Sequence, residues 1–160
     1  LLGCIRSGDL LPWHNDLDML LPSDQYKKFC SIIPNLKQKN WRVHTYKMAN
    51  DGPGWKKDDA KGIKIFNNFF LKFGRGRIVM DITVTYRNGD DYYRKAMGRT
   101  WKLPSKYLEG YDTLNYHGHS IKIPRHIEDY LTFLYGDWKK PDQCYDPLTT
   151  DKSLSRKGLI

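Results

Sequence analysis

Residues 12–21 read Pro12-Trp13-His14-Asn15-Asp16-Leu17-Asp18-Met19-Leu20-Leu21, and two carboxylates here precede an apolar run. Acidic and apolar residues alternate from Asp16 onward, and a period of two is typical of a β-strand. Side chains two residues apart on a strand point to the same face, so Asp16 and Asp18 are expected side by side. We therefore expect a buried strand over residues 16–21 whose first residues face a functional site.

The carboxylates point to a metal centre. Two carboxylates on one face repel each other, and a cation stabilises such a pair. Hard oxygen ligands suit Mg²⁺ or Mn²⁺, which commonly hold substrate phosphates. Asp81 interrupts an otherwise apolar predicted strand, where an unpaired charge is costly. If the two strands are neighbours, Asp16, Asp18 and Asp81 converge as the metal ligands and catalytic residues of a phosphoryl-transfer centre. The alternatives are a DxD pair in an ordinary loop and an Asp81 paired with Arg or Lys.

Length and composition exclude several classes of protein. The 160 residues suit one domain, and with 39% hydrophobic and 28% charged residues the chain is neither disordered nor membrane-like. No apolar run approaches the roughly 18–20 residues of a membrane span, and no internal repeat occurs. The chain starts at Leu1 without a basic-then-apolar leader, so we expect an excised domain that lacks N-terminal residues.

The net charge of +9 is unevenly distributed. Residues 1–24 carry a net charge of −3, which leaves +12 on the other 136 residues. An acidic island in a basic chain is typical of a cation site that faces an anionic substrate. Nucleic acid, a nucleotide or a phospholipid surface would satisfy the basic part, and a solvated surface kept for solubility explains it as well.

The rest of the chain mixes strands and helices irregularly. Strands are predicted over residues 41–48, 63–73, 77–86 and 120–124, and helices after Ser23 and over residues 125–135. Pro34 is expected to end or kink the first helix, Gly136 to end the last, and a turn at residues 74–76 to join two strands. This order favours an α+β fold with a mixed β-sheet flanked by helices over a doubly wound parallel fold.

Residues 1–18, Leu-Leu-Gly-Cys-Ile-Arg-Ser-Gly-Asp-Leu-Leu-Pro-Trp-His-Asn-Asp-Leu-Asp, resemble the LicD family, which includes fukutin and fukutin-related protein. Members typically read LLGAxRxGxxIPWDxDxD here. The wider nucleotidyltransferase superfamily has a small-residue turn followed, after about ten residues, by Dh[DE]h. This chain differs by Cys4 in place of Gly or Ser and by His14 in place of an acid, and it keeps the DxD.

The resemblance continues in the second half of the chain. Val79-Met80-Asp81-Ile82 resembles the hDI strand of the family, and residues 118–124, 130–131 and 134–141 resemble its closing G-x-x-h-x-h-P, YL and YGDW…P signature. The resemblance thus implies one LicD-like domain with a nucleotidyltransferase-like fold over residues 1–141. A loosely ordered polar tail is expected at residues 142–160.

Members of the family move a phospho-substituent, such as phosphocholine or ribitol 5-phosphate, from a CDP-activated donor to a sugar or glycan acceptor. The resemblance implies Mg²⁺ or Mn²⁺ on Asp16 and Asp18, with Asp81 as a third ligand or as the base that takes the acceptor proton. It implies no nucleic-acid partner. Animal members act in the secretory pathway, in the Golgi lumen, and bacterial ones in the cytoplasm; a missing N-terminal segment would carry any membrane association.

Four further residues are candidates for binding the donor. Gly3 forms the small-residue turn before the DxD, and Arg6 would contact a phosphate or pair with Asp9. Lys64 alternates with apolar residues, so it points into the cleft with the metal or toward solvent. Trp13 would stack on the cytosine or pack the loop.

Two other functions fit the same residues. A nucleotidyltransferase would use the three carboxylates to transfer the nucleotide itself and release pyrophosphate, whereas the LicD-type reaction releases CMP. A non-catalytic basic module that binds an anionic glycan or nucleic acid would explain the charge of +9, and its binding would survive replacement of Asp16 and Asp18.

Overall fold

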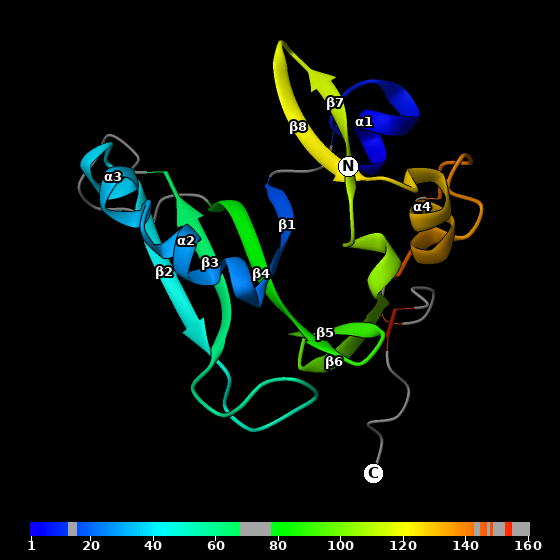
Figure 1. Ribbon diagram of the computed structural model, residues 1–160. Coiled ribbons are helices and arrows are strands. Elements are labelled where there is room, and N and C mark those ends of the chain that lie inside the picture. The colour runs from blue at the N-terminus through cyan, green and yellow to red at the C-terminus, as the bar shows by residue number, and fades with distance from the viewer. Residues whose placement is uncertain (13–15, 68–77, 143–144, 147, 149–152, 155–160) are drawn as a thin grey trace. The chain divides into compact units, whose positions relative to one another are not determined.

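The computed structural model describes residues 1–12, 16–67, 78–142, 145–146, 148 and 153–154 (Figure 1). The chain divides into two compact units. The sheet unit is Asn15–Gly98, and the terminal unit combines Leu1–His14 with Arg99–Ile160. Both units combine strands with short helices, which confirms the α+β class. Among the described residues, no helix is long and apolar enough to cross a membrane.

A mixed sheet organises the sheet unit. Its strands are β1 (Leu17–Pro22), β2 (Arg42–Lys47), β3 (Ala60–Phe66), β4 (Ile78–Asn88) and β5 (Asp91–Ala96). β1 runs parallel to β4, while the pairs β2–β3, β3–β4 and β4–β5 are antiparallel. The prediction of a mixed sheet is therefore confirmed. The two strands that carry Asp18 and Asp81 are direct neighbours, as a shared site requires.

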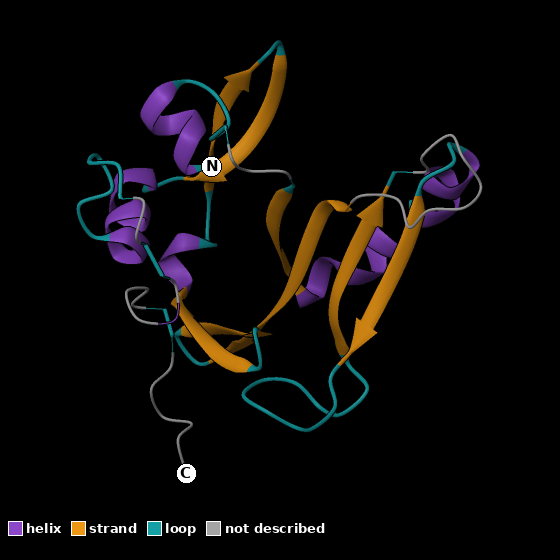
Figure 2. Ribbon diagram, turned by 180° about the vertical axis from the view of Figure 1, so that it is seen from behind, coloured by secondary structure: helices purple, strands orange, loops and turns teal. Residues whose placement is uncertain are grey.

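Short helices lie on one face of this sheet, as the opposed views of Figures 1 and 2 show. They are η1 (Ser23–Gln25), α2 (Tyr26–Cys30) and α3 (Ile33–Gln38). Under them, the buried side chains of Ile63, Ile65 and Ile82 pack against Tyr26 and Phe29. Successive strand residues alternate between faces, so Asp81, next to Ile82, points to the face opposite the helices.

Two predictions about this unit need correction. The single helix expected after Ser23 is divided into η1, α2 and α3, and Pro34 lies in the first turn of α3. Proline is accepted there because the first N–H groups of a helix have no intrahelical partner, and α2 ends at Cys30, four residues earlier, where Pro34 has no N–H to donate. The interruption before Pro34 agrees with the prediction that this residue ends the first helix. The strand expected over residues 16–21 forms as β1, but its first half is exposed rather than buried. In the described part of the sheet, β1 pairs with β4 on one side only.

The terminal unit has its own core. It contains α1 (Leu2–Ser7), β6 (Arg99–Pro104), η2 (Ser105–Tyr107), β7 (Tyr111–Tyr116), β8 (His119–Pro124) and α4 (Ile127–Tyr135). β7 and β8 form an antiparallel hairpin whose turn residues, His117 and Gly118, both have positive φ. Leu131 of α4 is fully buried, and Gly136 follows the helix as predicted.

Part of the predicted tail packs on the terminal unit. Trp101 forms a β-bridge with Leu154, and the N–H of Lys102 donates to the carbonyl of Ser153 at 2.5 Å. Ser153 is buried. The turn predicted at residues 74–76 lies outside the described residues.

Candidate functional site

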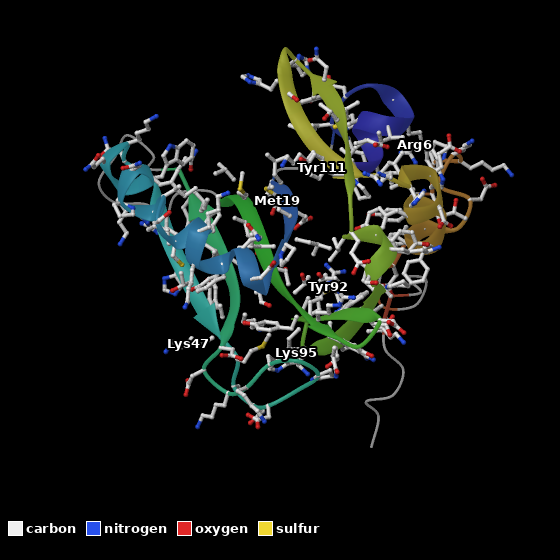
Figure 3. The ribbon with its side chains drawn as sticks, viewed as in Figure 1. Arg6, Met19, Lys47, Tyr92, Lys95 and Tyr111 are labelled. Atoms are coloured by element: carbon white, nitrogen blue, oxygen red, sulfur yellow. The ribbon has the colours of Figure 1, made fainter. Side chains whose placement is uncertain are left out.

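A row of charged and polar residues crosses four neighbouring strands of the sheet unit. In register, Asp18 of β1 pairs with Asp81 of β4, Asp81 with Lys64 of β3, and Lys64 with His44 of β2. Paired residues on adjacent strands point to the same face, so these four side chains share the face opposite the helices. Figure 3 labels Met19 and Lys47 on β1 and β2, the first and last strands of this row.

The centre of the row is an ion pair. The Nζ atom of Lys64 lies 2.8 Å from Oδ2 of Asp81, and the two side chains are 32% and 29% exposed. The hydrogen bond to Asp81 raises the pKa of Lys64 against the opposing effect of burial, and the charges of Asp81 and Asp16 add to the increase. Lys64 is therefore positively charged at neutral pH. Of the two orientations predicted for Lys64, the structure shows the one toward the carboxylates.

Asp16 and Asp18 flank this pair on the β1 side. Asp16 directly precedes β1, both side chains are exposed, and the charge of Asp16 is close enough to Lys64 to raise its pKa. Convergence of the carboxylates was conditional on the two strands being neighbours, and β1 and β4 are neighbours. The sequence left open whether Asp81 pairs with a basic residue, and the structure shows that it does.

The residues present fit a hard divalent cation by their chemistry, because carboxylate oxygens are the ligands that Mg²⁺ and Mn²⁺ prefer. They are not assembled as a ligand set: in the part of the chain that the structure describes, no three His, Cys, Asp or Glu side chains are grouped to hold a metal ion. Lys64 contacts Asp81. Asp18 and Asp81, paired in register, are the residues that a cation would bring together.

A β-bulge lies beside the site. Ile65 of β3 pairs with Met80, but the next residue, Phe66, pairs with Ile78, so Val79 has no opposite residue on β3. Bulges bend a strand and reorient side chains, and they are frequent next to functional sites. This one lies two residues before Asp81. Local sequence periodicity contains no signal for it.

His44 and Tyr46 were not predicted as site residues. His44 is the register partner of Lys64, and the ring centroids of His44 and Tyr46 are 4.8 Å apart. The alternation of residues 42–46 places both rings on one face of β2. The missing information was that β2 lies beside β3, because that pairing joins segments distant in sequence.

Three of the candidate donor-binding residues precede the sheet unit. A Cβ atom on Gly3 would lie 2.5 Å from the carbonyl oxygen of Asp9 and 2.8 Å from the backbone nitrogen of Leu11, so packing requires glycine there. Nη1 of Arg6 donates to the carbonyl of Trp138 at 3.2 Å. Trp13 lies outside the described residues. For all three, contact with the donor stays a prediction.

The ion pair between Arg6 and Asp9, one of the two predicted alternatives, is not formed. Asp9 instead accepts hydrogen bonds from the hydroxyl of Tyr116 at 2.5 Å and from the N–H of Leu10 at 2.7 Å. These bonds, with the Tyr116 bond as the largest cause, hold the pKa of Asp9 below its usual value. Through its hydrogen bond with Tyr116, Asp9 connects the segment after α1 to the β7–β8 hairpin.

Comparison with protein families gives a match over most of the chain. A family model described as "LicD/FKTN/FKRP, nucleotidyltransferase domain" matches residues 1–126, which include the whole sheet unit, part of the terminal unit and all the candidate site residues. A search of curated proteins found none that matches the chain.

Proposed function

The chain belongs to the LicD family of phospho-substituent transferases, and we propose that it moves a phospho-substituent of the ribitol phosphate or phosphocholine type from a CDP-activated donor to a glycan acceptor. The observation that carries this proposal is the register pairing of Asp18 with Asp81, with Lys64 on Asp81. Phosphoryl transfer depends on positioning and on charge neutralisation, and this row supplies groups of both signs.

The charges of the site support a divalent cation. Asp18 and Asp81 are paired in register, and a cation stabilises two like charges that lie side by side. Asp16 and Asp18 would hold Mg²⁺ or Mn²⁺, with Asp81 as the third carboxylate. When bound, the metal would neutralise the diphosphate of the donor and so ease the departure of CMP.

The reaction itself balances without a further reagent. The acceptor hydroxyl oxygen bonds to the phosphorus that carries the alditol or choline group, and the bond from this phosphorus to the bridging oxygen of the diphosphate breaks. CMP leaves with that oxygen and its electron pair. If Asp81 acts as the base, it takes the hydroxyl proton. Lys64 would contact the phosphate oxygens, because an ammonium forms strong, charge-assisted hydrogen bonds to phosphate.

A nucleotidyltransferase reaction is the second candidate, because the matching family model is described as a nucleotidyltransferase domain. We also propose that the sheet unit has a nucleotidyltransferase-like fold, in which the carboxylates lie on one mixed sheet. The same three carboxylates would serve both reactions, and the products differ. Transfer of the nucleotide from CTP releases pyrophosphate, whereas transfer of the phospho-substituent releases CMP.

The test follows these products. The 160-residue chain would be incubated with CDP-ribitol, CDP-choline or CTP, with Mg²⁺ or Mn²⁺ and with sugar acceptors. We expect CMP from a CDP-linked donor, dependent on the metal and lost in Asp18→Asn. Asp90→Asn, in an exposed turn of the same unit, is the matched control and should behave as wild type. Pyrophosphate from CTP would favour nucleotide transfer. Binding without any product, unchanged in Asp16→Asn/Asp18→Asn, would favour the basic module.

A further inference from the structure

The row of site residues ends on β2 in a pair of aromatic rings. The ring centroids of His44 and Tyr46 are 4.8 Å apart with planes inclined by 59°. His44 is exposed, and Tyr46 is 39% exposed. In register, His44 pairs with Lys64 and Tyr46 with Gly62. Two ring side chains therefore stand on the same face as the carboxylates, one strand beyond the lysine.

These rings do not belong to the core of the sheet. Val43, which alternates with them on β2, packs against the buried isoleucines on the helix side. The rings point the other way, to the face that carries Lys64. Burial of apolar surface therefore explains why Val43 lies on β2, but it does not explain the rings of His44 and Tyr46, which are exposed. Paired rings beside a cation have the composition of a ligand site.

The order of groups across the sheet matches the order of groups in a nucleotide. Neighbouring strands lie about 4.8 Å apart, so the rings on β2 are roughly 10 Å from the strand that carries Asp81. From β2 to β1 the face presents aromatic rings, then an ammonium, then carboxylates. A nucleoside diphosphate on a metal ion presents a base, then phosphates, then the cation. The base would thus lie over the rings, the phosphates over the ammonium and the cation over the carboxylates.

We propose that His44 and Tyr46 bind the nucleobase of the donor, with the diphosphate extending over Lys64 toward Asp81 and Asp18. This inference rests on the proposed function, because it takes the donor to be nucleotide-activated. Stacking uses the π-face that every base has, so the two rings supply affinity rather than a choice of base. A sugar acceptor would also stack on such rings. A sugar, however, has no phosphate to bind the Lys64 ammonium, which lies between the rings and the carboxylates. We therefore assign the rings to the donor.

The experiment compares two ligands that differ by the nucleoside. CDP and inorganic pyrophosphate would be titrated by calorimetry, in the presence of Mn²⁺, into wild type, His44→Ala/Tyr46→Ala, Tyr46→Phe and Thr45→Ala. We expect the double variant to bind CDP roughly 5- to 100-fold more weakly and pyrophosphate as wild type does. Tyr46→Phe keeps the ring and should keep its affinity. Thr45→Ala, exposed on the opposite face of the same strand, is the matched control.

The possible outcomes separate this inference from the proposed function. If the double variant binds CDP as tightly as wild type, or if its affinity for pyrophosphate falls equally, the rings do not hold the base and the proposed function stands. If wild type binds CDP no better than pyrophosphate, the inference is wrong. If wild type binds neither ligand with Mn²⁺, the proposed function fails and the inference fails with it. Circular dichroism of each variant shows that a lost affinity is not a lost fold.

Discussion

Replacing Lys64 by methionine tests how the charges of the site balance. Methionine keeps most of the apolar length of lysine but removes the ammonium that lies 2.8 Å from Asp81. Asp81 then loses its ion-pair partner, so a divalent cation would compensate the charge of Asp81 in place of the ammonium. We expect Lys64→Met to bind Mn²⁺ more tightly and, with Mn²⁺ present, pyrophosphate more weakly than wild type.

The magnitude follows from the exposure of the pair. Exposed ion pairs contribute up to about 1 kcal/mol, and disrupting a buried one costs about 3–5 kcal/mol. With 32% and 29% of their side-chain surface exposed, Lys64 and Asp81 lie near the lower end of this range, at about 1–2 kcal/mol. A metal ion that takes Asp81 as a ligand disrupts this pair in wild type but not in the variant. The affinity for Mn²⁺ should therefore rise roughly 5- to 30-fold.

The assay is calorimetric titration of Mn²⁺ into wild type, Lys64→Met and Lys57→Met. Lys57 is exposed in a loop of the same unit, so its replacement gives the same change of net charge away from the row. Equal Mn²⁺ affinities in all three proteins would refute the reasoning, because Asp81 would then take no part in binding the metal. A weaker affinity in Lys64→Met alone would refute it too, since Lys64 would then support the metal site.

Three further predictions concern stability. Leu131→Ala, at a fully buried position of α4, should lower the free energy of unfolding by about 2–5 kcal/mol in urea, and a loss below 1 kcal/mol would contradict the packing described. Gly3→Ala should destabilise by about 1–3 kcal/mol, because its Cβ would lie 2.5 Å from the Asp9 carbonyl oxygen; an unchanged melting temperature would contradict that contact. Burial, with the Asp59 charge, raises the pKa of Tyr86 to about 12, so the folded state holds this proton more tightly than the unfolded state. The protonated Tyr86 should contribute about 2–3 kcal/mol to the free energy of unfolding below pH 10, and this contribution should be lost as the pH rises to 12. The Tyr86→Phe variant should lack this part of the pH dependence.

Local pattern predicted those features that depend on neighbouring residues. The alternation around Asp16 and Asp18 predicted the strand that forms as β1, and the apolar context of Asp81 indicated a partner for its charge, which is Lys64. The helix over residues 127–135 and the Gly136 after it follow from spacing and from the freedom of glycine at positive φ.

Features that depend on distant segments were missed. The roles of His44 and Tyr46 depend on β2 lying next to β3. That pairing is a tertiary contact, which a single sequence does not reveal. Pro34 was expected to end or kink the helix, and the chain is interrupted before it; that a second helix, α3, begins at this point was not predicted.

The most direct test of the central claim is the metal-dependent binding of CDP to wild type and Asp18→Asn, measured by calorimetry with Mg²⁺ or Mn²⁺ and with EDTA. We predict binding that requires the metal, is lost in Asp18→Asn and is kept in Asp90→Asn. Binding of CDP that persists in EDTA and in the Asp16→Asn/Asp18→Asn variant would contradict the account, because the ligand would then be held by the basic surface and not by the carboxylate row.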